Sequence, residues 1–204
     1  MEIDIVGEDP VTQSMIERLL KEYRSDITIK NRLPARGGQI QNLAPKYNAL
    51  GSPVFLLTDL DSYNCPPQLI KKWFGEENIS NELLFRIAQE EAETWLMADR
   101  KGFSKWLSVD ENLIPELKLI DKKKGISEII FPIKPSLFMM MRIASHSTNK
   151  KLKEDLTPKK GAGKGPAYNS AMLPFIEKKW NIENAASNSY SLTKAIERLK
   201  NFNP

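Results

Sequence analysis

The sequence predicts an α/β fold, in which a parallel sheet of about four strands is flanked by helices. Three observations lead to this prediction. Short apolar segments alternate with longer segments of helical character over residues 1–107. The connections between the apolar segments are long enough for the helical crossovers that parallel strands require. Residues 54–57 are apolar without alternation, which is typical of a central strand buried on both faces.

The first elements of this pattern are a strand and a helix at the N-terminal end. Residues 3–7 form a short apolar strand. Asp9-Pro10 ends it and begins a helix, because proline is favoured in the first turn, where its missing N–H would be unpaired anyway. The β-branched run Ile27-Thr28-Ile29 predicts the second strand. Residues 39–49 follow as the second helix.

The third and fourth strands carry the clearest apolar signal. Residues 52–59 predict the third strand, and Pro66-Pro67 opens a helix that reaches about Phe74. Residues 83–88 predict the fourth strand, and a long helix is expected from Glu90 towards Leu107. The order of these elements predicts a sheet with helices on both of its faces.

The character of the sequence changes after residue 107, so we predict an α/β core at 1–107 and a basic, mostly helical extension at 108–204 packed on it. Residues 108–133 show no clear period. A Met-rich helix at 135–145 and a Lys/Gly-rich loop at 149–166 come next. The last helices are expected at about 167–179, 182–187 and 191–201.

Composition limits the kinds of site that this chain can form. There is one cysteine (Cys65) and one histidine (His146), so zinc sites of the usual kinds are excluded and any metal would be a hard ion on carboxylates, such as Mg²⁺, Mn²⁺ or Ca²⁺. No apolar run is long enough to span a membrane. With an acidic N-terminus unlike a signal peptide, the expected location is the reducing cytoplasm.

Charge is unevenly distributed along the chain. Residues 1–100 carry a net charge of −5 and residues 101–204 a net charge of +9, which together give the +4 of the whole chain. An acidic half beside a basic half suits a metal–carboxylate site next to a surface that binds a polyanion. The alternative is ordinary surface charge.

Carboxylates follow the predicted strands at the edge where ligands of parallel sheets bind. Glu8 follows the first strand, and Asp59 and Asp61 follow the third. We predict that these three hold Mg²⁺ or Mn²⁺, with the two aspartates on the same side of a still-extended chain. Glu91 and Glu93, after the fourth strand, are candidates for a further ligand or a general base, and either is possible. The alternative roles are a strand-ending cap for Asp59–Asp61 and a favourable helix-dipole interaction for the glutamates.

Basic residues in the second half are candidates for phosphate contacts. Glycines among them would let the backbone approach a phosphate closely. A solvated loop is the alternative, and a plain turn is the alternative for the arginine. The candidates are Arg36, Lys150, Lys151, Lys153, Lys159, Lys160 and Lys164.

Several segments resemble a known family. Residues 5–10, a strand followed by a glutamate and a helix, look like the first Toprim motif, and residues 56–61 look like its Asp-x-Asp motif. Residues 88–99, 154–158 and 165–169, together with Cys65-Pro66-Pro67, resemble a bacterial Toprim-like family, so the resemblance covers nearly the whole chain. The usual Toprim order is Glu-Gly, whereas this chain has Gly7-Glu8. Asp4 and Asp9 are the nearby substitutes for the carboxylate, and we favour Glu8.

The resemblance implies a Toprim-like core at 1–107 and a Mg²⁺-dependent nuclease of the overcoming-lysogenization-defect type. It also implies nucleic acid, with DNA favoured, as substrate, and an ATPase of the ABC or SMC type as partner in anti-phage defence. Assembly with itself is a further expectation. Two other functions remain open: a non-catalytic subunit that binds nucleic acid or the ATPase, and a hydrolase of small phosphate esters.

Overall fold

The computed structural model describes residues 1–33, 35, 38–123 and 125–204 of the chain. They divide into two compact units, one formed by Met1–Glu90 with Lys194–Pro204 and the other by Glu91–Thr193. The division falls between Glu90 and Glu91, and the C-terminal residues belong with the first unit. The predicted domain boundary at residue 107 stays a prediction.

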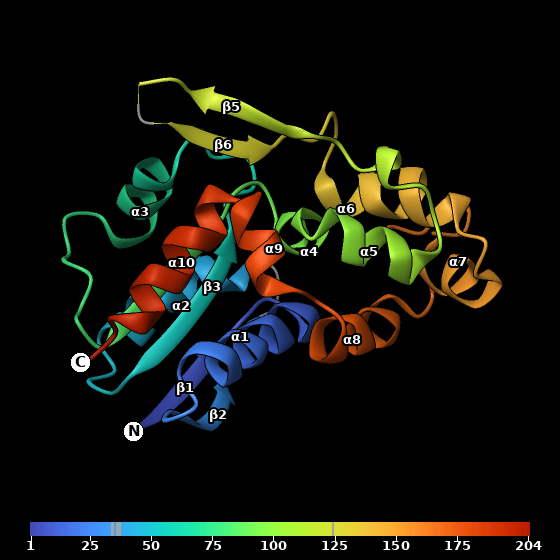
Figure 1. The fold of residues 1–204 in the computed structure, drawn as a ribbon. Helices are drawn as coiled ribbons and strands as arrows, with labels where there is room; N and C mark the ends of the chain where they lie inside the picture. The colour runs from blue at the N-terminus through green and yellow to red at the C-terminus, as the bar shows by residue number, and fades with distance from the viewer. Residues whose placement is uncertain (34, 36–37, 124) are drawn as a thin grey trace. The chain divides into compact units, whose positions relative to one another are not determined.

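The first unit is built on a parallel sheet of four strands (Figure 1). The strand order is β2-β1-β3-β4, and every neighbouring pair is parallel. This confirms the predicted α/β class with a four-stranded parallel sheet flanked by helices. The strands are β1 (Glu2–Val6), β2 (Thr28–Leu33), β3 (Val54–Asp59) and β4 (Leu83–Ala88).

Helices cover both faces of this sheet. On one face, alternate residues such as Val6, Leu56 and Phe85 form a buried cluster with residues of α2 (Gln39–Asn48) and α3 (Pro66–Phe74). The residues between them on the strands point to the opposite face. There, α1 (Pro10–Tyr23) packs against β1 and β3. The helix begins as predicted, because the Asp9 side chain accepts a hydrogen bond from the Thr12 amide.

The second unit is mostly helical, and the prediction of one long helix at its start is wrong. The helix expected over residues 90–107 is two helices, α4 (Glu93–Ala98) and α5 (Arg100–Leu107). Asp99 separates them: its backbone leaves the helical region, and its side chain caps α5 by accepting a hydrogen bond from the Gly102 amide at 3.2 Å. A capping aspartate at this point favours a new helix over continuation of the first.

Two further stretches differ from the prediction. Residues 108–133 contain an antiparallel hairpin of β5 (Leu117–Asp121) and β6 (Ile126–Ile129). Lys150–Leu156 is a helix, α7, and not a loop, because the Asn149 side chain caps it. The Met-rich segment is α6 (Pro135–Phe138) with π-helical and 3₁₀ turns after it. A short 3₁₀ turn at Glu111–Leu113 precedes the hairpin. The chain ends with three helices, α8 (Tyr168–Lys178), α9 (Ile182–Ser187) and α10 (Tyr190–Lys200).

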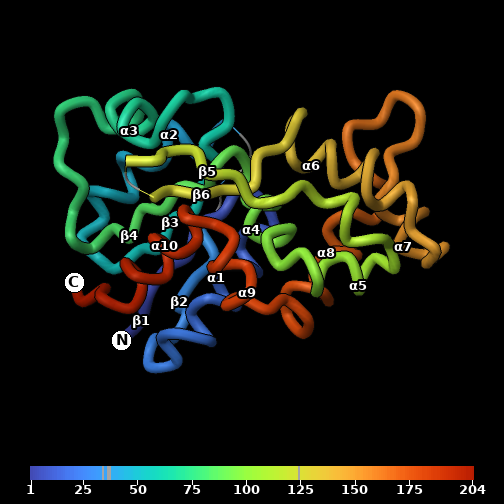
Figure 2. The backbone as a smooth tube through the Cα atoms, turned by 45° about the horizontal axis from the view of Figure 1, so that its top comes forward, coloured from blue at the N-terminus to red at the C-terminus, as the bar shows by residue number. Residues whose placement is uncertain are grey.

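Aromatic side chains form the core of the second unit. Phe103 and Trp106 of α5 pack against Phe175 of α8, with ring centroids 5.2 and 4.9 Å away. Figure 2 shows the tube of α8 beside those of α5 and α7. Trp95 of α4 is fully buried. No helix in the described part of the chain is long and apolar enough to cross a membrane.

Candidate metal centre

The ends of β3 and β4 lie side by side at the carboxyl edge of the sheet. Asp59 is the last residue of β3 and pairs with Ala88 in β4. Beyond the strands, the Asp61 amide donates to the Glu90 carbonyl at 2.9 Å. Both Asp61 and Glu90 adopt left-handed backbone angles, with φ of 52° and 60°. The chain is therefore no longer extended at Asp61, and the prediction that it continues the strand beside Asp59 is wrong.

Glu91 begins the second unit and is only 5% exposed. Its carboxylate accepts a 2.6 Å hydrogen bond from the Ser136 amide and forms a 2.9 Å ion pair with Lys134. Ser136 lies in the first turn of α6, where backbone N–H groups have no partner within the helix. The carboxylate thus satisfies one of these donors, and one lysine offsets its charge.

Glu93, in the first turn of α4, is 7% exposed. It accepts a hydrogen bond from the hydroxyl of Tyr168, a buried residue at the start of α8. The ammonium of Lys164 lies 4.7 Å from the centre of the Tyr168 ring. A lysine from the basic loop is therefore connected to Glu93 through one tyrosine.

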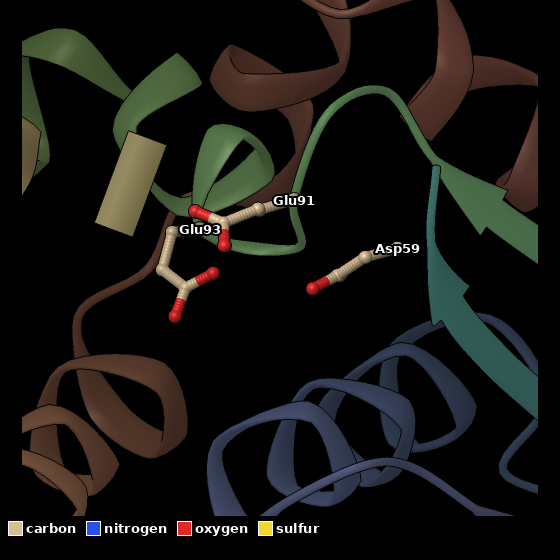
Figure 3. A group of neighbouring side chains, drawn as sticks. All are labelled: Asp59, Glu91 and Glu93. Atoms are coloured by element: carbon tan, nitrogen blue, oxygen red, sulfur yellow. The ribbon is translucent and has the colours of Figure 1, made fainter. Parts of the chain in front are cut away.

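Asp59, Glu91 and Glu93 form a group, called here the acidic group, that could hold a metal ion. Each residue offers a carboxylate oxygen, and these oxygens lie within 4.8 Å of one another. Figure 3 shows the three side chains, with Asp59 extending from the end of a strand. Since Glu91 directly follows Glu90, whose carbonyl is bonded to the Asp61 amide, the path of the chain carries Glu91 to the end of β3. All three ligands are oxygens, as Mg²⁺, Mn²⁺ and Ca²⁺ prefer.

Glu8 and Asp61 lie outside the acidic group, so their role as ligands stays a prediction. Glu8 is half-buried in the loop after β1, and its carboxylate accepts a hydrogen bond from the Thr58 hydroxyl at 3.1 Å. Burial raises the pKa of the Glu8 carboxyl above its usual value; the negative charges of Asp61 and Asp9 add to this, and the Thr58 hydrogen bond opposes it. Asp61 is exposed.

The predicted phosphate-contacting lysines are all exposed and lie in one segment of the second unit. Lys150, Lys151 and Lys153 lie on α7, and Lys159, Lys160 and Lys164 follow it. The loop returns to the end of α7, where the Ala167 amide donates to the Asp155 carbonyl at 3.0 Å. Arg36 lies outside the described residues.

Sequence reasoning missed the partners of the two glutamates. Lys134 and Ser136 contact Glu91 from the start of the predicted Met-rich helix, more than 40 positions away, and Tyr168 contacts Glu93 from 75 positions away. The only available signal was the resemblance of residues 165–169 to the family.

Comparison with known proteins does not identify the chain. No protein-family model matches the sequence, and neither the curated proteins nor the solved structures gave a match. The functional argument therefore depends on the acidic group and on the residues around it.

Proposed function

We propose that this chain is a Toprim-like, metal-dependent phosphodiesterase that hydrolyses nucleic acid. The observation that carries the proposal is the acidic group of Asp59, Glu91 and Glu93, with carboxylate oxygens within 4.8 Å of one another. Two of these side chains are less than a tenth exposed, and burying like charges together is costly unless other groups offset them. Lys134 offsets one charge. A divalent cation bound to all three carboxylates would lower the cost of gathering their charges further.

The donor set supports Mg²⁺ or Mn²⁺ as the cation. Softer ions are usually held by sulfur or imidazole, and the group offers neither. When bound, such an ion supplies Lewis-acid polarisation of a phosphate ester. The site lies at the carboxyl ends of parallel strands, where open α/β sheets commonly bind their ligands.

Other residues of the chain could take roles that fit hydrolysis. Glu8, with a raised pKa and an orientation fixed by Thr58, is the candidate general base for an attacking water. Lys164 and the exposed lysines of α7 are the candidates for contacts with the nucleic-acid backbone. A polyanion is the better substrate class than a small phosphate ester, because one phosphate would not engage so many separate cations.

A second candidate function is that of a non-catalytic subunit that binds nucleic acid or a partner ATPase. The β5–β6 hairpin supports it, since Leu119 and Ile120 are 54% and 48% exposed on a short two-stranded sheet. Exposed apolar side chains close together are typical of protein-binding surfaces. On this view the ABC- or SMC-type ATPase of the resembling family, in an anti-phage setting, would be the partner.

The test is DNA cleavage by the wild type, by Asp59→Asn and by Glu77→Gln, which changes an exposed glutamate of the same unit. Plasmid and single-stranded DNA are incubated with Mg²⁺, with Mn²⁺ or with EDTA. With Mg²⁺ or Mn²⁺ we expect cleavage by the wild type and by the control, and a cleavage rate at least about 100-fold lower in Asp59→Asn. In EDTA we expect no cleavage by any of the three proteins. Equal cleavage by all three proteins would refute the site. Salt-sensitive DNA binding without cleavage would favour the second candidate.

A further inference from the structure

A second site is indicated by a cavity that lies wholly within the first unit. Its volume is about 450 Å³, which is within the range of small-molecule pockets. Residues of the edge strand β4, of the loop before it and of the C-terminal segment line it. No residue of the acidic group belongs to this lining, so the cavity is distinct from the candidate metal centre.

Two arginines give the cavity a positive character. Arg86 of β4 and Arg198 of α10 both line it. The Nε of Arg86 is buried and has no hydrogen-bond partner. Burial lowers the pKa of the Arg86 guanidinium, and the charge of Arg198 lowers it further. Among the described residues, no carboxylate is paired with either arginine.

A partly buried guanidinium without a carboxylate partner, as in Arg86, is unusual, because burial of a charge is costly without a partner. Two guanidinium groups that face one cavity also repel each other. An anion placed between them would reduce the repulsion and would offset the cost of burying the Arg86 guanidinium. The remainder of the lining combines polar residues such as Ser80 and Asn81 with apolar ones such as Leu83 and Phe202.

The wall formed by the C-terminal segment is held in place by the first unit itself. Arg24, at the end of α1, donates hydrogen bonds to the carbonyls of Leu199 and Phe202 at 3.3 and 2.6 Å. The Arg24 side chain is also paired with Asp26 at 2.8 Å. Since this anchoring uses only protein groups, the wall does not require a ligand to form, and the cavity is pre-organised.

We propose that this cavity binds a small organic anion, with its phosphate or carboxylate group between Arg86 and Arg198 and its apolar part against Leu83 and Phe202. A phosphate is the favoured group, because it offers enough oxygens to engage two guanidinium forks at once. The volume suits a ligand of one or two rings. The site would therefore take a monomeric ligand in a protein whose proposed substrate is a polymer.

The test is isothermal titration of the intact protein with phenyl phosphate in EDTA, so that no metal contributes to binding. Benzoate and inorganic phosphate are titrated in parallel, and phenol serves as the uncharged probe. The variants are Arg198→Gln and Arg86→Gln, with Lys200→Gln as the matched control, an exposed cation of the same helix outside the cavity lining. Asp59→Asn is the control for binding at the acidic group.

We expect saturable binding of phenyl phosphate that Arg198→Gln weakens by about tenfold or more, since one charge-assisted contact is lost. Lys200→Gln and Asp59→Asn should bind as the wild type does, and phenol should not bind. Binding of benzoate with the same dependence on Arg198 would support a carboxylate as the anionic group. Absence of saturable binding in the wild type, or binding that persists in Arg198→Gln, would overturn the proposal. Arg198 is exposed, so this result does not depend on whether Arg86→Gln folds.

Discussion

Replacement of Glu93 by glutamine removes one negative charge from the acidic group and keeps the size of the side chain. In the metal-free protein, this change relieves repulsion between Glu93 and Glu91, whose carboxylate oxygens lie within 4.8 Å of each other. With metal present, it removes a ligand. We therefore predict effects of opposite sign: Glu93→Gln stabilises the protein in EDTA and reduces the stabilisation that Mn²⁺ provides.

The magnitudes follow from the geometry. Two unit charges 4.8 Å apart repel by about 3.5 kcal/mol at an effective dielectric constant of about 20. The hydrogen bond from Tyr168 loses its charge assistance, which costs about 1 kcal/mol, and Lys134 already screens part of the repulsion. A net gain of about 1–2 kcal/mol remains, equivalent to a rise in Tm of about 2–8 °C for a chain of this length.

The same variant should bind metal at least about 100-fold more weakly. Loss of a residue that only hydrogen-bonds a metal ligand already weakens metal binding by about 10–100-fold, and loss of a ligand itself should weaken it more. At a Mn²⁺ concentration of about 100 times the wild-type Kd, the metal would stabilise the wild type by about 2.7 kcal/mol and the variant by about 0.4 kcal/mol.

The assay is thermal unfolding of the wild type, Glu93→Gln and Glu177→Gln in EDTA and in Mn²⁺. Glu177 is an exposed glutamate of α8, so its replacement should change neither value. A lower Tm of Glu93→Gln in EDTA, together with an unchanged shift in Mn²⁺, would refute the reasoning.

Three further predictions concern the second unit. Burial raises the pKa of Glu128, so the folded state binds its proton more tightly; stability should fall as pH rises from about 4.5 through the raised pKa, and Glu128→Gln should flatten this slope in urea titrations. Gly165→Ala places a Cβ 2.4 Å from the Leu156 backbone, so the loop must shift, and hydrogen exchange there should accelerate. Asp99→Ala removes the cap of α5 and the partner of the Asn181 amide, and calorimetry should show a loss of about 2–4 kcal/mol.

Much of the fold follows from the sequence because each buried strand is apolar and separated from the next by a helical segment. The prediction was least complete at the edge. Only residues 27–29 were expected in the second strand, yet β2 extends from Thr28 to Leu33. Its polar residues Lys30, Asn31 and Arg32 are accessible and carry no hydrophobic period, so pairing with β1 and not burial defines them as a strand.

The break between α4 and α5 was missed for the opposite reason. Buried apolar residues lie on both sides of the boundary, at Trp95–Ala98 before it and at Phe103 after it, so the sequence was interpreted as one helix. The cap on Gly102 and the hydrogen bond from the Asn181 amide to the Asp99 carboxylate mark the boundary. The second of these contacts joins residues 82 positions apart, and local sequence does not report it.

The site was predicted in part. Asp59 was placed correctly at the end of β3, and both candidate glutamates after β4 are in the acidic group. Asp61 was expected on an extended chain, but its φ of 52° places it in a turn, a local choice that an Asp-Leu-Asp pattern does not specify. Glu8 accepts a hydrogen bond from Thr58 because the pairing register of β1 and β3 brings the two residues together. Local sequence does not specify this register.

The most direct test of the central claim is the location of a bound ion by anomalous diffraction from crystals grown with Mn²⁺. The account predicts a peak within coordination distance, about 2.0–2.3 Å, of carboxylate oxygens of Asp59, Glu91 and Glu93, and no such peak in Glu93→Gln at the same concentration. A Mn²⁺ peak on other carboxylates, or an acidic group that stays without the ion at saturating Mn²⁺, would contradict it.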